Sequence, residues 1–353
     1  NPNDSTTYDN RGLAYYEPQN YIQAIRDYTQ AIKLDPKDVS AYKNRGNAYS
    51  EQKKYKKAIA DYTQAIKLDP EDADAYKNRG LAYYKLQNYI QAIEDYIQAI
   101  ALNPKYADLC NNLGNAYYKL QNYDQAIKDF TQAIELDPKD ARAYFNRGKA
   151  YIKLQNYDQA IKDFTQAIEL DPKNASYCNN RGKTYIKLRN YDQAIENYIR
   201  AIEVDPKDAV AYFNRGKAYI KLQNYDQAIK DFTQAIELDP KYVKAYYNRG
   251  VAYSDQKKHN KAIADYTKAI ELDPSYVKAY YNRGVAYSDQ KKHSKAIADY
   301  TKAIELDPKY VKAYSNRAMA YFLTQNYKQA IEDYRQAIKL DPRIDIMEDM
   351  IIP

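Results

Sequence analysis

The sequence predicts an all-α fold, a solenoid of antiparallel helix pairs, and three observations carry that prediction. The tripeptide Leu-Asp-Pro, or a close variant, recurs every 34 residues with no insertion or deletion. Inside each period the apolar positions step by three, four and seven residues, which is the spacing of one face of an α-helix. Small residues return at fixed positions, where two helices must approach closely. An internal repeat of this length is typical of helical-repeat arrays.

The period divides the chain into ten repeats once each proline of the tripeptide is placed at position 32. The repeats are 5–38, 39–72, 73–106, 107–140, 141–174, 175–208, 209–242, 243–276, 277–310 and 311–344. We expect residues 1–4 to be the remnant of a preceding repeat. We expect residues 345–353, which are largely apolar, to form a capping tail over the last repeat.

Each repeat is expected to form one helix over about positions 2–14 and a second over about positions 18–30. The proline at position 32 ends the second helix, because the residue before a proline is pushed out of helical geometry. Asp or Asn at position 34 can cap the next helix, and this position is filled in that way by Asp38, Asp72, Asp140, Asn174 and Asp208. Tyrosine takes the same position at Tyr106, Tyr242, Tyr276 and Tyr310 and cannot cap in this way.

Packing positions alternate between small and large residues. Alanine occupies positions 20 and 27 in all ten repeats, and all nine glycines of the chain lie at position 8. A glycine inside a helix costs about 1 kcal/mol relative to alanine, so we expect a backbone or a ring to press against it. Cys110 and Cys178 replace tyrosine at position 4, each after a bulky residue, Leu109 or Tyr177, which predicts a packing role for both thiols.

This pattern resembles the tetratricopeptide repeat family along nearly the whole chain. The family pattern has an aromatic residue at positions 4, 11 and 24, Gly at 8, Ala at 20 and 27, and Pro at 32. The resemblance implies a right-handed superhelix with a concave groove, whose surface comes from positions 2, 5, 6, 9, 12 and 13 and the loop around 33–34.

Composition excludes several classes of protein. The chain is 45% hydrophobic and 29% charged, which is not the composition of a disordered segment. Its formal charge of +7 is too small by itself to indicate nucleic acid. No stretch approaches the ~20 apolar residues of a membrane span. Two cysteines make no disulfide framework and favour a reducing compartment, so we expect a cytoplasmic protein.

No catalytic, metal or cofactor site emerges from the sequence. The only histidines, His259 and His293, lie one repeat apart at position 17, where other repeats carry tyrosine. Since every glycine is committed to position 8, no phosphate-binding loop can be assembled. We therefore expect a protein that is not an enzyme and needs no cofactor.

An asparagine at position 6 of every repeat has no evident reason in helix packing, because asparagine forms helices poorly. These residues are Asn10, Asn44, Asn78, Asn112, Asn146, Asn180, Asn214, Asn248, Asn282 and Asn316. An amide can both donate to and accept from a peptide unit, so a column of amides can hold an extended chain by its backbone. The column is similar to the asparagine ladders of peptide-binding superhelices in this family. The alternative is that each amide bonds to the neighbouring repeat.

Charge changes along the same predicted groove. The early repeats place carboxylates there, and the middle repeats place lysines and phenylalanines, namely Lys149, Lys183 and Lys217 at position 9, Lys153, Lys187 and Lys221 at position 13, and Phe145 and Phe213 at position 5. The late repeats add Tyr247 and Tyr281 at position 5. We predict that an acidic segment of a ligand docks on the fourth to seventh repeats. The alternative is that the lysines are simply solvated.

A carboxylate clamp, the family motif that grips a chain-terminal carboxylate, is incomplete. Lys43, Asn47 and Asn78 match the motif. Asp108 and Asn112 stand where the motif requires Lys and Arg, and Asp108 would repel a carboxylate. We do not assign this function.

Position 7 carries leucine in the family but arginine in nine repeats here, with Leu113 as the exception. Position 23 is Asp in nine repeats and Asn197 in the other. Because a partly buried guanidinium needs a carboxylate partner, we predict that Arg45 and its equivalents pair with these aspartates. Arginines paired in this way are not available for phosphates.

These observations favour an interaction scaffold that binds an extended, partly acidic peptide. Two alternatives stay open: a helical-repeat protein that binds single-stranded RNA, because basic and aromatic residues alternate in the predicted groove, and the targeting arm of an enzyme whose catalytic domain lies outside this sequence. Self-association is also compatible with the sequence.

Overall fold

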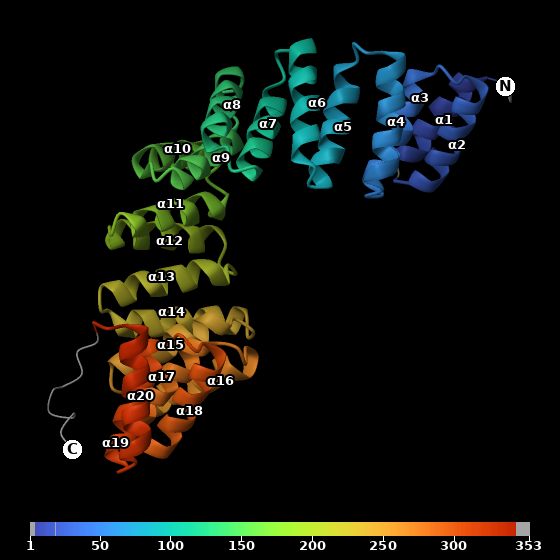
Figure 1. The fold of residues 1–353 in the computed structure, drawn as a ribbon. Coiled ribbons are helices and arrows are strands. Elements are labelled where there is room, and N and C mark those ends of the chain that lie inside the picture. Colours follow the sequence, from blue (N-terminus) through green and yellow to red (C-terminus); the bar gives the residue numbers. More distant parts are fainter. Residues whose placement is uncertain (1–3, 18, 344–353) are drawn as a thin grey trace. The chain divides into compact units, whose positions relative to one another are not determined.

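The computed structural model describes residues 4–17 and 19–343 and contains two compact units, Asn1–Lys173 and Asn174–Pro353. The helices of the N-terminal unit are α1 (Ser5–Tyr16), α2 (Tyr21–Leu34), α3 (Val39–Glu51), α4 (Tyr55–Leu68), α5 (Ala73–Lys85), α6 (Tyr89–Leu102), α7 (Ala107–Lys119), α8 (Tyr123–Leu136), α9 (Ala141–Lys153) and α10 (Tyr157–Leu170) (Figure 1). Those of the C-terminal unit are α11 (Ala175–Lys187), α12 (Tyr191–Val204), α13 (Ala209–Lys221), α14 (Tyr225–Leu238), α15 (Val243–Asp255), α16 (His259–Leu272), α17 (Val277–Asp289), α18 (His293–Leu306), α19 (Val311–Leu323) and α20 (Tyr327–Leu340).

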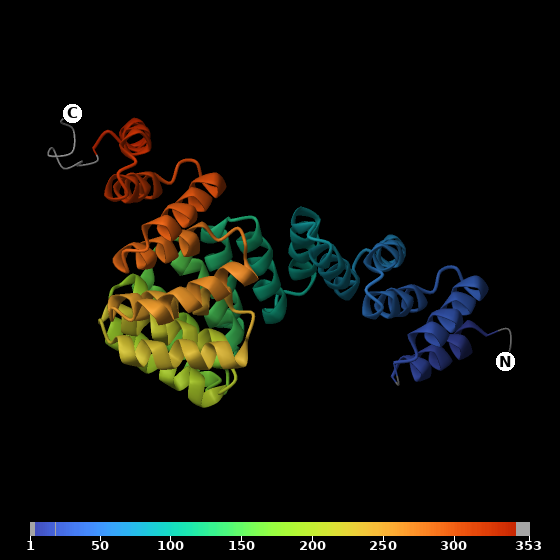
Figure 2. The ribbon, with the colours of Figure 1, turned by 90° about the horizontal axis from the view of Figure 1, so that it is seen from below.

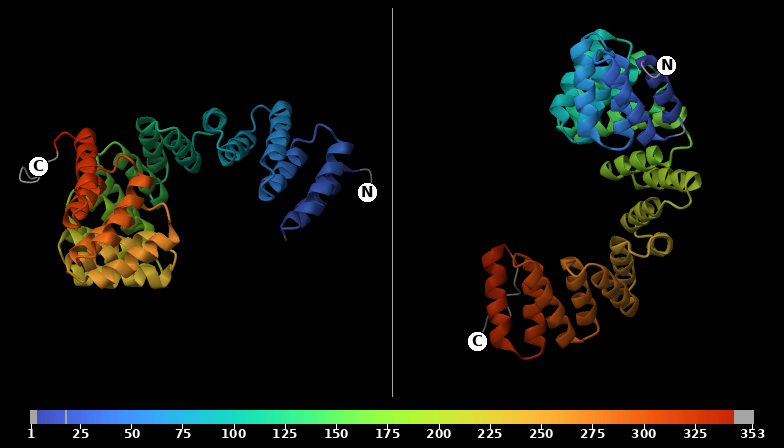
Figure 3. Two further views of the ribbon diagram at one scale, coloured as in Figure 1. Left: turned by 60° about the horizontal axis from the view of Figure 1, so that its bottom comes forward. Right: turned by 90° about the vertical axis from the view of Figure 1, so that its right-hand side faces the viewer.

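Each repeat is one antiparallel helix pair, so the predicted all-α solenoid is confirmed (Figures 2 and 3). No strand occurs among the described residues. Apart from α1, which stops at position 12, the first helix of each repeat covers positions 1–13, and the second helix covers positions 17–30 throughout, close to the expected bounds.

Helix starts follow the predicted caps. The side chains of all five residues accept a hydrogen bond from a backbone N–H in the first turn of the helix that follows, namely Asp38, Asp72, Asp140, Asn174 and Asp208. The four tyrosines at the same position make no such bond. An asparagine at position 16, such as Asn156, often caps the second helix as well.

The turn inside each repeat places one residue other than glycine in the left-handed region, at position 15. In Gln155, for example, φ is 59°, and all ten equivalents have φ between 57° and 62°. A side chain in this region costs roughly 1–2 kcal/mol, and glycine is the residue that usually relieves it. All nine glycines lie at position 8, so no residue type at position 15 predicts this conformation.

The core confirms the prediction for the glycines. Gly148 lies beneath the ring of Phe164, and a Cβ on that glycine would stand 2.7 Å from a ring carbon. Every other glycine meets the position-24 ring of its own repeat in the same way. The alanines at positions 20 and 27 are at most 2% exposed and fill the remaining space between helices.

The two cysteines pack as predicted. Cys110 and Cys178 are both 1% exposed, and neither forms a disulfide. Leu109 and Tyr177 beside them are buried too, so the bulk of the missing tyrosine has moved by one residue. Burial raises the pKa of the Cys110 thiol to about 11, which keeps it protonated at neutral pH.

The expectations for the two ends of the chain, a repeat remnant and a capping tail, fall mainly on residues that the structure does not describe. Residues 1–3 of the expected remnant and residues 344–353, with the expected capping tail, lie outside the described residues. In the part that is described, no helix is both long enough and apolar enough to cross a membrane.

Candidate peptide-binding face

The first helices of successive repeats contact one another within each unit, as α11 does with α13 and α13 with α15. Positions 2, 5, 6, 9 and 13 of these helices therefore form one surface in each unit, which we call the ladder face. It contains all the ligand-binding residues predicted from the sequence.

The arginines of position 7 are structural, as predicted. Arg45 binds the Asp61 carboxylate through Nε and Nη2, at 2.9 and 2.7 Å. Eight repeats have this two-point pair, with distances of 2.7–2.9 Å, between Arg11 and Asp27, Arg45 and Asp61, Arg79 and Asp95, Arg147 and Asp163, Arg215 and Asp231, Arg249 and Asp265, Arg283 and Asp299, and Arg317 and Asp333. In the sixth repeat Arg181 donates to Asn197 at 2.6 Å. These guanidinium groups are engaged with the fold.

The same arginines also join repeats. Arg45 Nη1 donates to the hydroxyl of Thr29 in the preceding repeat, at 3.2 Å. Five further arginines make the equivalent bond, namely Arg79, Arg147, Arg249, Arg283 and Arg317. The arginine thus holds both the helix pair and the neighbouring repeat, a role that a leucine at position 7 cannot supply.

The fourth repeat lacks this arrangement. Leu113 replaces the arginine there. Asp129 is 5% exposed, and it lacks the ion pair with arginine that the aspartates of other repeats form. Its Oδ1 accepts from Gln125 at 3.1 Å, and its Oδ2 is buried without a hydrogen-bond partner. Burial raises the pKa of Asp129 to about 6.

Half of the ladder asparagines bond to the preceding repeat, which is the structural alternative stated above. Asn44 Nδ2 donates to Asp9 at 3.1 Å, and Asn146 Nδ2 donates to Asn111 at 3.0 Å. Asn78 donates in the same way to Asn47. Asn282 donates to the Tyr247 hydroxyl, and Asn316 donates to the Tyr281 hydroxyl. In each case the amide nitrogen is the donor, and Asn44 contacts both carboxylate oxygens of Asp9, at 3.1 and 3.3 Å.

Three other ladder asparagines, all in the C-terminal unit, behave differently. Asn180 and Asn248 donate to carbonyl groups of their own helices, at 2.8 and 2.7 Å. Asn214 Nδ2 is buried and has no hydrogen-bond partner. Asn10 is exposed and Asn112 is half-buried.

The aromatic residues at position 5 pack into the fold. Phe213 is 7% exposed, and its ring lies 5.8 Å from that of Phe232 and 4.9 Å from that of Tyr242. Phe213 therefore presents little of its ring on the ladder face. Phe145, which is half-buried, lies 5.7 Å from the Phe164 ring.

Tyr247 and Tyr281 take up the same position and use their hydroxyls to accept from ladder asparagines. Burial raises the pKa of Tyr247 to about 12. Both tyrosines therefore connect repeats, and only the exposed part of each half-buried ring remains open to a ligand.

The predicted lysines lie on the ladder face in two groups, one in each unit. In the N-terminal unit, the Lys149 ammonium stands 4.9 Å from the centre of the Phe145 ring and 5.7 Å from that of Tyr118. Burial and the neighbouring Lys119 lower the pKa of Lys149. Lys153 is exposed.

The C-terminal unit gathers five exposed lysines, Lys183, Lys187, Lys217, Lys221 and Lys244, which we call the lysine cluster. Burial of the amine lowers the pKa of Lys217, and the other four ammonium groups lower it further, so all five charges converge. Among the described residues, none of the five forms an ion pair. The cluster is a concentration of positive charge that no ion pair among the described residues neutralises.

The residues that match a carboxylate clamp are engaged within the fold. Lys43 Nζ pairs with Asp72 at 2.7 Å. Asn47 Oδ1 accepts from the Tyr62 hydroxyl at 2.8 Å, and the carboxylate of Asp108 pairs with Arg142. These contacts agree with leaving the clamp unassigned.

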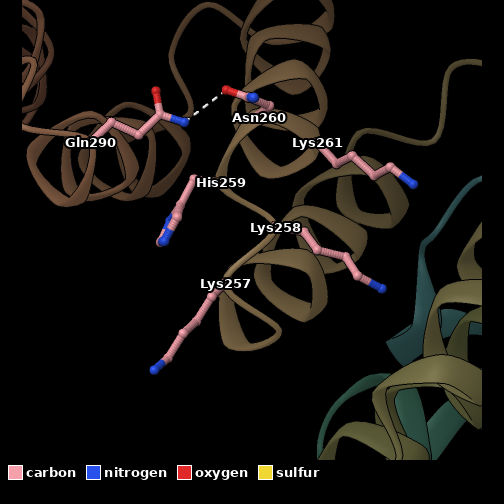
Figure 4. Close-up of a pocket in the computed structure, with 6 residues that line it drawn as sticks. All are labelled: Lys257, Lys258, His259, Asn260, Lys261 and Gln290. Carbon is pink, nitrogen blue, oxygen red and sulfur yellow. Dashed lines mark hydrogen bonds between the residues drawn. The ribbon is translucent and has the colours of Figure 1, made fainter.

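A cavity of about 430 Å³ lies at the turn between α15 and α16 (Figure 4). Lys257, Lys258, His259, Lys261, Asn260 and Gln290 line it. Gln290 donates to Asn260 at 2.7 Å, and the side chain of Lys257 points away from those of Lys258 and Lys261. His259 Nδ1 lies 3.5 Å from Asp289 Oδ2, and no group of three or more potential metal ligands occurs among the described residues.

Comparison with protein families decides the assignment. Models described as tetratricopeptide repeat match residues 73–106, 111–175, 164–196, 243–276, 277–310 and 311–344, and a model described as TPR repeat matches 12–53, 46–87, 185–223 and 216–257. The chain belongs to the tetratricopeptide repeat family. A search of curated proteins finds no match.

Solved tetratricopeptide repeat proteins share the fold. The C-terminal part of a repeat protein from Cytophaga hutchinsonii is 23% identical, with a TM-score of 0.59, over 69% of this chain and 99% of that one. A tetratricopeptide repeat protein from Parabacteroides merdae is 21% identical, with a TM-score of 0.52, over 73% and 98%. YrrB, described as a TPR protein with an unusual peptide-binding site, is 28% identical over 53% and 96%, with a TM-score of 0.46.

Proposed function

We propose that this tetratricopeptide repeat chain is a non-enzymatic interaction scaffold that binds an extended, partly acidic peptide on its ladder face. The observation that carries the proposal is the lysine cluster, five converging ammonium groups on the surface that also bears the asparagine column. Like charges held together without carboxylates raise the free energy of the unliganded surface, and an acidic ligand relieves that repulsion.

The asparagine column supports recognition of the peptide backbone. Where an amide uses one N–H to bond the preceding repeat, its oxygen and second N–H remain to pair with a peptide unit, as for Asn146. Backbone recognition of this kind tolerates many side chains, so specificity comes from the charges beside the column.

RNA binding is less well supported by these contacts. Nucleic-acid bases bind single-strand proteins by stacking on aromatic faces. Phe213 is buried, and the Phe145 ring carries the Lys149 ammonium on its face. The rings beside the lysines are thus largely occupied by the protein itself.

A charge-reversal experiment tests the proposal. We expect the wild-type chain to bind a fluorescent extended peptide with a run of Asp and Glu residues more tightly than the same peptide with Asn and Gln. Lys183→Glu, Lys217→Glu and Lys221→Glu together should weaken binding by at least about tenfold, and added salt should also weaken it.

The control makes the same change of charge away from the ladder face, with Lys257→Glu, Lys258→Glu and Lys261→Glu at the turn shown in Figure 4. Equal losses from both triple variants would mean that net charge alone drives binding and would overturn the proposal. Tighter binding of a single-stranded RNA oligonucleotide than of the acidic peptide would favour the RNA alternative instead.

A further inference from the structure

The ladder of the C-terminal unit contains one unpaired rung, between Asn179 at position 5 of the sixth repeat and Asn214 at position 6 of the seventh. Asn179 is 5% exposed, and its Oδ1 is buried without a hydrogen-bond partner. Asn214 Nδ2 is likewise buried and unpartnered. An acceptor on α11 and a donor on α13, two helices in contact, are thus both unsatisfied.

The corresponding rung of the N-terminal unit is closed. Asn111 and Asn146 occupy the same two positions, and Asn146 Nδ2 donates to Asn111 Oδ1 at 3.0 Å. Residue type therefore does not explain why the rung at Asn179 and Asn214 is open.

One difference between the two rungs lies in the repeats that carry Asn146 and Asn214. Repeats 141–174 and 209–242 differ only at positions 2 and 34, and position 2 is Arg142 in one and Val210 in the other. Arg142 Nε and Nη2 bind the Asp140 carboxylate, at 3.0 and 3.2 Å. Val210 cannot do this.

Val210 replaces the arginine in the seventh repeat, and the equivalent carboxylate is that of Asp208. Asp208 accepts from Asn179 Nδ2, as well as capping α13. The Asn179 amide is drawn to Asp208, and its oxygen does not meet Asn214. We infer that valine at position 210 leaves Asp208 free to draw the Asn179 amide away from Asn214.

An open buried rung is costly, because each unsatisfied polar atom costs roughly 1–3 kcal/mol. Natural proteins leave few such atoms, and those that persist call for an explanation. The rung lies on the ladder face among the lysines of the cluster, since Lys183 and Lys217 belong to the same two helices. A ligand that bonds both atoms would recover this free energy, and a peptide unit offers the required pair, a C=O and an N–H.

We propose that Asn179 and Asn214 form the anchoring rung for the ligand, and that they hold the peptide unit of an Asp or Glu residue whose carboxylate meets Lys183 and Lys217. The peptide C=O accepts from Asn214 Nδ2, and its N–H donates to Asn179 Oδ1. Both atoms are covered in the ligand-free chain, so binding requires side chains above them to turn aside, as interface side chains commonly do. The inference rests on the proposed peptide-binding function and locates its anchor.

Val210→Arg provides the sharpest test, because it copies Arg142 and should release Asn179 to close the rung with Asn214. The added positive charge would by itself strengthen the binding of an acidic peptide. We nevertheless expect binding about three- to tenfold weaker than wild type, with the thermal unfolding midpoint unchanged or raised. Asn214→Ala should weaken binding to a similar degree.

Asn282→Ala is the matched control in the same unit, because Asn282 already donates to Tyr247. It should lower the thermal unfolding midpoint more than Asn214→Ala does, and it should weaken binding less. If Val210→Arg binds the acidic peptide as tightly as wild type or more tightly, or if Asn214→Ala leaves binding unchanged, the anchoring rung is overturned. The peptide-binding function would still stand in that case, because the wild-type chain binds the peptide. Failure of the wild-type chain to bind any acidic peptide would overturn both.

Discussion

At the scale of single residues, buried charges in this chain are stable because they are paired. Eight aspartates at position 23 are buried against an arginine that grips both carboxylate oxygens, such as Asp163 with Arg147. Buried carboxylates need such partners, since removal from water strongly disfavours an unpaired charge. Asp129 is the position where the partner is missing, because Leu113 replaces it.

The stability of the chain should therefore depend on pH through Asp129. Its pKa in the folded chain is about 6, above the ordinary 3.8, so the folded state holds this proton more tightly than the unfolded chain. The contribution of this carboxyl group to the free energy of unfolding is fully present below about pH 4. It falls by ~3 kcal/mol as the pH rises to about 6, because the folded chain must then give up a tightly held proton. We expect Leu113→Arg to raise the urea unfolding midpoint at pH 7 and to do so much less at pH 4.

Arg147→Leu is the control for this prediction, because it creates the same unpaired carboxylate at Asp163. It should lower the midpoint at pH 7 and have a smaller effect at pH 4. A Leu113→Arg variant with the same stability gain at both pH values would show that Asp129 is not the group that titrates.

The residue scale also shows how far sequence reasoning reaches. The pairing of arginine and aspartate was predictable, because residue types alone require it and their positions are fixed by the period. The partners of the ladder asparagines were not, because they depend on what the preceding repeat places at position 5, for example Asn111 or Tyr247, or at position 9, as Asn47 does for Asn78. The burial of Phe213 likewise depends on the rings packed beside it, Phe232 and Tyr242.

At the scale of the helix pair, glycine sets how closely the two helices approach. Alanine normally stabilises a helix relative to glycine by about 1 kcal/mol. Here the added Cβ of Gly148→Ala would stand 2.7 Å from the Phe164 ring, and the ring is buried at 0% exposure with no room to move. We expect this change to destabilise the chain by about 1–3 kcal/mol in urea unfolding, the opposite sign from helix propensity.

The last repeat supplies the comparison, because Ala318 replaces the glycine there and Tyr334 is only half-buried. Ala318→Gly should follow helix propensity and destabilise by about 1 kcal/mol. A stabilising Gly148→Ala would show that the ring yields and that glycine does not set the helix spacing.

The turn within each pair was the least predictable element. Its left-handed residue at position 15 is Gln, Lys or Arg, and none of these residue types marks such a conformation. The period and the apolar spacing predicted the helices, whereas the turn geometry follows from how the two helices meet.

At the scale of the whole molecule, the repeats are alike in their cores and differ on the ladder face. The core positions keep the same residue types throughout, so the fold was predictable from the period. The charges of the ladder face are not needed for that packing, and in the C-terminal unit they gather as the lysine cluster. Function in this chain is therefore carried by the variable positions on a constant scaffold.

Lysine footprinting with and without an acidic peptide tests this account most directly. Limited acetylation read by mass spectrometry reports the accessibility of each amine. We predict that the peptide protects the lysine cluster, Lys183, Lys187, Lys217, Lys221 and Lys244, and leaves Lys257, Lys258 and Lys261 at the turn as reactive as before. Equal protection of both groups, or protection of the turn lysines alone, would contradict a peptide-binding ladder face.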